Sequence, residues 1–286
     1  SVASPFFLSG RNLSNILVQA SVIALLAGGQ TFVILTGGVD LAVGALTALA
    51  GAVAGYMMVK LGINPYLAIL AAFGIGAAVG LFNGHLVAFV GIPAFIVTLG
   101  GLTLWRGLAF ESTGGFDMAG LPEPFPFIGN GELLGIPMPI IVMALFYGVM
   151  GFILSSTKLG RYVYAIGSNE MGARQVGINI RWYKLGVYLV SGLSCALAAI
   201  VLMGRMDSSS GKMAQMFELD AIAAVILGGT SLFGGRGSLW GSLLGAILIG
   251  MNLLEVSQFK QMMAIGAVVI LAVWIDVVRR KRLLRK

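Results

Sequence analysis

Long apolar stretches follow one another along almost the whole chain, separated by short segments rich in Gly, Pro or charged residues. A helix needs about 20 consecutive, mostly apolar residues to cross a bilayer, and many of these stretches are long enough. Only 10% of the residues are charged, whereas a soluble domain carries about 25% because its surface faces water. The chain has too few charges for a water-soluble globule of its size, and the sequence predicts an all-α membrane protein.

The stretches predict one transmembrane domain over residues 1–286, a polytopic bundle of about nine spanning helices. The expected spans lie at about 13–36, 40–59, 65–90, 93–110, 138–155, 184–204, 218–233, 238–254 and 260–278. Residues 91–93, which end in Pro93, predict a tight break between the third and fourth spans. The 42 glycines are typical of membrane helices whose backbones approach each other closely.

Charged residues predict which loops face the cytoplasm, because loops rich in Lys and Arg stay on that side. The loop at 155–184 has five basic residues and one acid, and six of the last eight residues are basic. The loop at 111–137 has four acids and no base, so we expect it outside. Nine spans agree with these sides and place Ser1 outside. We therefore expect a further span before Ser1, which gives about ten spans in the full-length protein and a cytoplasmic C-terminus.

Two glycine-rich segments share the pattern GGxxLxxG, and each follows an apolar run that ends at the expected cytoplasmic side. The first starts at Gly37-Gly38 and includes Asp40, and the second starts at Gly228-Gly229. Transporters are often built from repeats with broken helices at corresponding positions, so these residues are candidates for a helix break or gate. One of the spans that meet at the first segment is then a half-helix. A chance match in a chain rich in Gly and Leu is the alternative.

Asp40 has two interpretations, both of which place it at the cytoplasmic end of the second span. It either caps that helix at its N-terminus or acts as a gate residue beside the glycine break. Capping is the better supported of the two, because Asp is a preferred N-cap residue.

The basic loop at about 156–183 predicts a short helix on the membrane surface. Ser168 or Asn169 can cap its N-terminus, Glu170 favours the positive end of the helix dipole, and Gly177 suits the position after the C-cap. A helix this short is not stable alone, which favours docking into a groove on a partner. An ordinary basic loop held by lipid headgroups is the alternative.

The spacing Glu170-x-x-Ala173-x-x-x-Gly177 resembles the Glu-Ala-Ala…Gly loop of bacterial ABC-importer permeases, which seats on the ATP-hydrolysing subunit. Segments at 34–44, 92–100, 160–167 and 217–231 resemble one branch, the ribose/xylose/arabinose-type sugar permeases. The resemblance extends from about residue 12 to 278, and it implies that Asn169, Glu170, Ala173 and Gly177 couple the permease to its ATPase. Residues 206–216 depart from the pattern of a strict ribose permease, which leaves the identity of the substrate open.

The resemblance implies a permease subunit of the bacterial inner membrane that translocates a pentose-like monosaccharide. A periplasmic sugar-binding protein would deliver the sugar, and a second permease copy or a homologue would complete the path. ATP and Mg would be bound by a partner ATPase, because this chain has no phosphate-binding GxxxxGK[ST] segment. We expect this chain to be no enzyme and to bind no cofactor or metal. Its basic residues cluster at helix ends beside lipid, which argues against nucleic acid.

Polar residues within or beside the apolar stretches are candidates for the sugar path, since such sites need a few well-placed polar groups. These candidates are Thr98, Asp220 and Asn252, with Gln30 and Ser194 more weakly supported. Asp220 is expected near the outer end, where it binds a sugar hydroxyl or pairs with Arg205 or Lys212. Arg106 and Glu111 are spaced for an ion pair at a helix end.

Two other functions stay open on the sequence. The same machinery would also suit another sugar-like solute, such as an autoinducer. An ion- or proton-coupled secondary carrier is the alternative from a different class. Such a carrier normally needs carboxylates in the middle of the membrane, and the acids here are expected near the edges.

Overall fold

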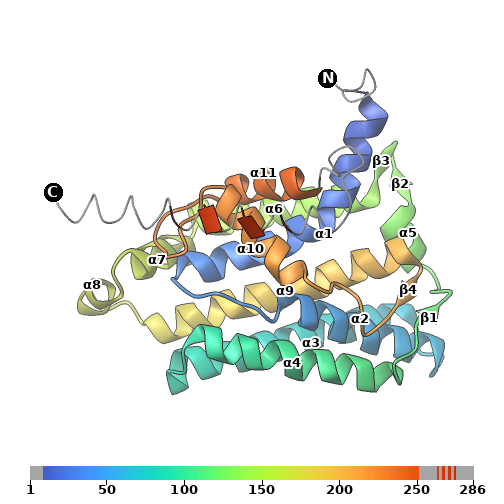
Figure 1. Cartoon of the computed structure of the whole chain (residues 1–286), viewed down its shortest axis with the longest axis horizontal. Coiled ribbons are helices and arrows are strands. Elements are labelled where there is room, and N and C mark those ends of the chain that lie inside the picture. Colours follow the sequence, from blue (N-terminus) through green and yellow to red (C-terminus); the bar gives the residue numbers. More distant parts are fainter. Residues whose placement is uncertain (1–8, 251–262, 264–265, 268–269, 272–273, 275–286) are drawn as a thin grey trace.

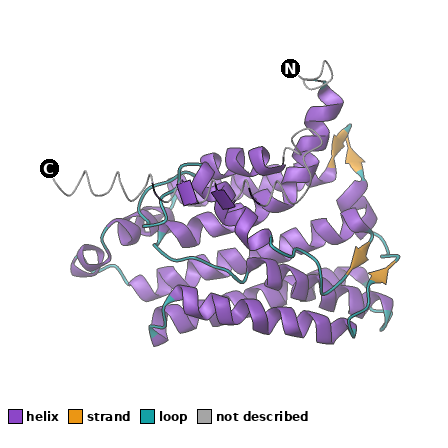
Figure 2. Cartoon of the chain, viewed as in Figure 1, coloured by secondary structure: helices purple, strands orange, loops and turns teal. Residues whose placement is uncertain are grey.

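The computed structural model describes residues 9–250 and, further along the chain, residues 263, 266–267, 270–271 and 274. The described part is an elongated bundle of helices, and its few short strands lie at one end (Figures 1 and 2). The prediction of an all-α membrane protein is confirmed. The expected span at 260–278 lies outside the continuously described residues.

Five helices of the described part are long and apolar enough to cross a bilayer. They are α1 (Gly10–Leu35), α3 (Pro65–His85) with its π-helical continuation η1 (Leu86–Val90), α4 (Ala94–Thr113), α6 (Met138–Ser156) and α9 (Ile180–Met206). Three shorter helices complete the bundle: α2 (Val43–Val59), α10 (Phe217–Leu227) and α11 (Leu239–Gly250). The expected count of nine full spans is not confirmed.

The two ends of the bundle differ in charge, as the loops predict. Helices α7 (Lys158–Ser168) and α8 (Glu170–Gln175) lie at one end, called here the basic end (Figure 1). Helix α5 (Phe125–Asn130) and the strands lie at the other, the acidic end. There β1 (Met118–Ala119) pairs antiparallel with β4 (Ser208–Ser209), and β2 (Glu132–Leu133) pairs with β3 (Ile136–Pro137).

Small residues bring the central helices into backbone contact. Helix α9 packs against α3 along a line of glycines on the α3 face. A Cβ added at Gly80 would lie 2.5 Å from the carbonyl oxygen of Tyr188, and one added at Gly192 would overlap the carbonyl oxygen of Gly76. This close approach explains the high Gly content, because van der Waals packing holds membrane helices together.

Three glycine-rich breaks interrupt the helices. Helix α1 ends at Leu35 and α2 begins only at Val43, with Gly37 at a φ of +79°. The predicted break between α3 and α4 is present, and Gly91 there has a φ of +84°.

The segment expected to span the membrane at 218–233 is only partly helical. Helix α10 has 11 residues, a length of about 16 Å against about 30 Å for the apolar core of a bilayer. It ends before Gly228-Gly229, where Gly229 has a φ of +85° and Gly228 packs against the backbone of Gly241 in α11. The span was predicted to extend to residue 233 because the residues after this turn are also uncharged as far as Gly235.

Candidate functional site

Helix α8 has the caps that its sequence predicts. Asn169 is the N-cap, and its Oδ1 accepts a hydrogen bond of 2.9 Å from the backbone N–H of Gly172. At the other end the N–H of Gly177 donates to the carbonyl of Arg174, and the N–H of Ile178 donates to that of Ala173. These two bonds form a Schellman motif, which needs a left-handed residue at Gly177, and the φ of Gly177 is +81°.

An ion pair and an apolar contact hold α8 on the start of α9. Glu170 Oε2 lies 2.7 Å from Lys184 Nζ of α9. Within α8 itself, Glu170 Oε1 lies 3.7 Å from Arg174. Ala173 is buried against Ile166 of α7 and Ile180 of α9. Of the residues predicted for coupling, Glu170 and Ala173 therefore anchor α8 to its own chain, while Asn169 and Gly177 set its two ends.

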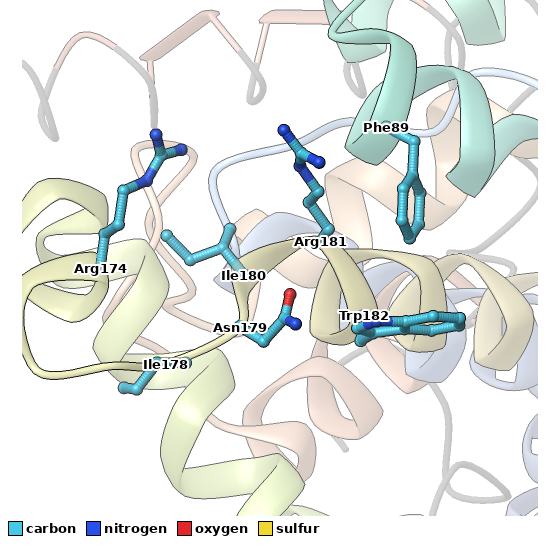
Figure 3. A pocket seen from close by; sticks show the side chains of 7 residues that line it. All are labelled: Phe89, Arg174, Ile178, Asn179, Ile180, Arg181 and Trp182. Carbon is cyan, nitrogen blue, oxygen red and sulfur yellow. The ribbon is translucent and has the colours of Figure 1, made fainter.

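The outer surface of the α8–α9 connection forms a shallow pocket of about 350 Å³ (Figure 3). The Arg181 guanidinium lies 6.0 Å from the centre of the Phe89 ring, and Trp182 meets the same ring edge to face at 5.4 Å. Arg174 and Ile178 line the pocket on the α8 side. Cationic and aromatic groups thus lie together beside α8 at the basic end.

Asp40 lies inside the bundle, which corrects the expected position at the cytoplasmic end of the second span. Its carboxylate accepts hydrogen bonds from Ser191 Oγ at 2.9 Å and from the backbone N–H of Ala42 at 3.0 Å. Ser191 lies eleven residues past the start of α9 at the basic end, a distance of about 16 Å along the helix. After α1 ends at Leu35, the chain turns back into the bundle without helical structure until α2 begins at Val43. This non-helical segment places Asp40 away from the basic end.

Asp40 is also not the N-cap residue of α2. That position is held by Ala42, which has no side-chain capping bond. Asp40 accepts instead from the N–H two residues further on, the local pattern by which Asp stabilises turns. Non-helical backbone at this depth is tolerated because it is buried in protein, where its polar groups find partners.

Neighbouring helices satisfy the backbone of the broken segment. The Thr98 hydroxyl of α4 contacts the carbonyl oxygens of Ala94, at 2.9 Å, and Val39, at 3.2 Å. With its amide oriented to suit both groups, Gln30 accepts from the N–H of Asp40 at 3.1 Å and donates to its carbonyl at 3.3 Å. Thr98 and Gln30, expected beside a sugar path, are buried and hold the helix break.

The two GGxxLxxG segments meet at the basic end, where a glycine from α7 also contacts them. The N–H of Gly235 donates to the carbonyl of Leu35 at 2.9 Å. A Cβ at Gly234 would lie 2.8 Å from the backbone nitrogen of Gly37, and one at Gly167 would overlap the Leu35 carbonyl. We call Gly37, Gly167, Gly234 and Gly235 the glycine junction. It joins both helix breaks to the residues that lead into α8.

Expected ion pairs at the acidic half of the bundle are not formed. Within the described part Asp220 makes no ion pair with Arg205 or Lys212, and it is half-buried near the start of α10. Arg106 does not pair with Glu111. It donates to the carbonyl oxygens of residues 211, 213 and 214, at 3.0, 2.6 and 3.3 Å.

Tyr188, Ser191 and the role of Arg106 were not predicted from the sequence. Ser191 and Tyr188 lie in an apolar helix where nothing local marks them, since their neighbours at the break are about 150 residues away in the chain. Asn252, the remaining candidate for the sugar path, lies outside the described residues.

Comparison with known proteins supplies a family. A family model described as "Branched-chain amino acid transport system / permease component" matches residues 12–278. The ribose import permease protein RbsC of Escherichia coli K12 is 43% identical over 285 residues, covering 96% of this chain and 88% of the relative. RbsC of Bacillus subtilis is 43% identical over 283 residues with the same coverage. The fructose import permease protein FrcC of Rhizobium meliloti is 35% identical over 286 residues, covering 94% and 79%.

Proposed function

Because this chain belongs to the family of permease components of branched-chain amino acid transport systems, we propose that it is the membrane-spanning subunit of an ATP-driven sugar importer. Helix α8 is the observation that carries this proposal. It has only six residues, yet it is capped at both ends and anchored to α9 through Glu170. Its outer side chains Met171 and Val176 are each 76% exposed. Such a helix suits docking on a partner subunit.

The proposed substrate is a monosaccharide, most closely a pentose such as ribose. Support comes from the relatives, whose names specify import of ribose and fructose and transport of D-allose and xylose. Two ribose permeases from distant bacteria are equally similar to this chain, at 43% identity over almost all of it. Another sugar-like solute, such as an autoinducer, is the alternative within the same mechanism.

The proposed assembly follows from the two ends of the bundle. The basic end faces the cytoplasm, as does the C-terminus with its six basic residues, and the basic end contacts an ABC ATPase that binds ATP and Mg. The acidic end faces a periplasmic sugar-binding protein, and a second permease copy or a homologue completes the path across the inner membrane. The whole chain forms a single permease domain that catalyses no reaction and holds no cofactor of its own.

The glycine breaks are proposed to act as the gate of this permease. Gly37, Gly38 and Asp40 form one break, and Gly228 and Gly229 form the other. Their proposed role is supported by the glycine junction, because any movement of α7 and α8 by the ATPase would press on backbone atoms of the first break. Thr98, Asp220 and Asn252 remain proposed members of the path.

One observation favours an ion-coupled secondary carrier instead. Asp40 is a buried carboxylate within the bundle, and intramembrane carboxylates often carry coupling ions or protons. Its two oxygens are nevertheless bonded to Ser191 and to the backbone of Ala42, which is the arrangement of a structural group. Uptake that needs a proton gradient and survives without ATP would establish the carrier.

The first experiment is co-purification in detergent of this chain with its ATPase, comparing wild type with Glu170→Arg. We expect the wild type to retain the ATPase and Glu170→Arg to lose it, because an Arg beside Lys184 and Arg174 would repel both and release α8. Glu132→Arg is the matched control, with the same charge reversal at the acidic end. Retention of the ATPase by Glu170→Arg would show that α8 is not the docking element. If the wild-type chain retained no ATPase, the importer proposal would fail.

A further inference from the structure

A polar cavity at the basic end of the bundle extends from α8 to the first helix break. Its volume is about 910 Å³, within the range of about 300–1,000 Å³ typical of small-molecule sites. The outer part is walled by charged side chains of α8 and α9, among them Glu170, Arg174 and Lys184. One side is the hairpin between η1 and α4, at residues 87–94. The cavity therefore lies directly between the proposed docking helix and the proposed gate.

Residues 36–38 of the first helix break line the cavity together with Phe233 and Tyr188. Tyr188 is fully buried, and within the described part its hydroxyl has no hydrogen-bond partner. Burying a hydroxyl without a partner is unfavourable, because the hydroxyl loses its hydrogen bonds to water and gains none in the protein. Asp40 lies near Tyr188, but its carboxylate is taken by Ser191 and Ala42. Tyr188 lines the cavity with its hydroxyl unpartnered, so a molecule bound there can supply the missing hydrogen-bond partner.

Gly38 lies directly against this hydroxyl. A Cβ added at Gly38 would lie 3.2 Å from the hydroxyl oxygen of Tyr188, so any larger residue would take up the space that a hydrogen-bond partner needs. The absence of a side chain at 38 and the unpaired hydroxyl are two independent features of one small polar recess. A neutral molecule with several hydroxyl groups suits it, because each hydroxyl both donates and accepts hydrogen bonds.

We propose that this cavity is the release site for a small neutral polyol, and that the Tyr188 hydroxyl binds it there through a hydrogen bond. The inference rests on the proposed sugar-import function and adds the place where the sugar leaves the bundle. A single hydrogen bond and a wide, charged, hydrated exit make binding weak, which suits release into water. The η1–α4 hairpin and α8 both line the cavity, so a movement of α8 on docking of the ATPase would change the shape of the exit.

The test uses a cysteine placed in the cavity wall, Ile92→Cys, in inside-out membrane vesicles that contain the full transporter. The chain's own Cys195 is fully buried and will not compete for the reagent. We expect a charged maleimide to label Cys at 92 and D-ribose to slow that labelling, while glycine betaine, which has no hydroxyl group, does not. Adding Tyr188→Phe should raise the ribose concentration needed for protection about fivefold, the effect of one hydrogen bond.

Two further variants separate hydrogen bonding from folding. Gly38→Ala leaves the tyrosine in place but puts a methyl group against its hydroxyl, so it should raise the protecting concentration in the same direction as Tyr188→Phe. Tyr162→Phe is the matched control, because Tyr162 meets the Tyr183 ring edge to face, with ring centres 4.9 Å apart, and is not part of the cavity wall. It should leave the protecting concentration unchanged.

The outcomes distinguish this inference from the proposed function. If the vesicles import ribose with ATP but ribose never protects position 92, the release site is wrong and the importer stands. If removal of the ATPase exposes position 92 while ribose has no effect, the cavity holds part of the ATPase, which also overturns the inference. If ribose is neither transported nor protective, both proposals fall.

Discussion

Asp40 is a single residue whose two carboxylate oxygens hold the first helix break to the bundle. Asp40→Ala would leave the Ser191 hydroxyl and the Ala42 N–H buried without their acceptor. Each unpaired buried donor costs about 1–3 kcal/mol, so we expect a clearly lower temperature of unfolding in detergent. Asp40→Asn should lower it less, because its remaining carbonyl oxygen can still accept from Ala42. Thermal unfolding followed by helical circular dichroism measures both effects.

Asp117→Ala provides the matched control for that series. Asp117 is exposed in the loop at the acidic end, and its removal should leave the unfolding temperature unchanged. If Asp40→Ala unfolded at the same temperature as Asp117→Ala, the hydrogen bonds to Ser191 and Ala42 would contribute no net stability.

Single residues were predictable from the sequence where their partners lie within a few positions. The caps of α8 at Asn169 and Gly177 depend on local backbone geometry, and they are present. Asp40 was misplaced because its partner Ser191 lies 151 positions away. Arg106 was paired with Glu111 on helical spacing alone, whereas it bonds to carbonyls more than 100 positions away. Distant partners leave no mark in a local pattern.

The glycine junction links three separate elements: the end of α1, the end of α7 and the loop between α10 and α11. A methyl group at Gly167 would overlap the carbonyl oxygen of Leu35, and overpacking of this kind costs about 1–3 kcal/mol. We expect Gly167→Ala to lower the unfolding temperature in detergent and to reduce ATP-driven uptake. Gly148→Ala in α6, where nothing lies within 4 Å of the added Cβ, should have neither effect. Equal stability of the two variants would show that the junction can open without cost.

Helix lengths followed from the sequence where a break contains proline or lies between charged segments. The break at residues 91–93 was placed correctly because Pro93 removes a backbone donor. The length of α10 was not predicted correctly, because the uncharged stretch continues through Gly228-Gly229 beyond the end of the helix. What ends α10 is a left-handed turn and close packing on α11. Packing between distant helices is absent from a hydropathy window.

The whole molecule has one basic end and one acidic end, and this asymmetry makes its orientation testable. Phe116 at the acidic end is 74% exposed, and Met171 at the basic end is 76% exposed. A cysteine at either position is accessible to water, while the native Cys195 is buried and silent. We expect a membrane-impermeant thiol reagent to label Phe116→Cys in spheroplasts and to label Met171→Cys only after the membrane is opened.

Orientation in turn decides which proposals can hold together. An ATPase acts from the cytoplasm, so α8 can serve as its docking element only if Met171→Cys is shielded in intact spheroplasts. Labelling of Met171→Cys from outside, with Phe116→Cys protected, would reverse the molecule and remove the ATPase from α8. The cavity beside the first helix break would then open to the periplasm, and it would receive sugar instead of releasing it. The basic residues of α7, α8 and the start of α9 favour the first orientation, because retention of Lys and Arg on the cytoplasmic side orients membrane proteins.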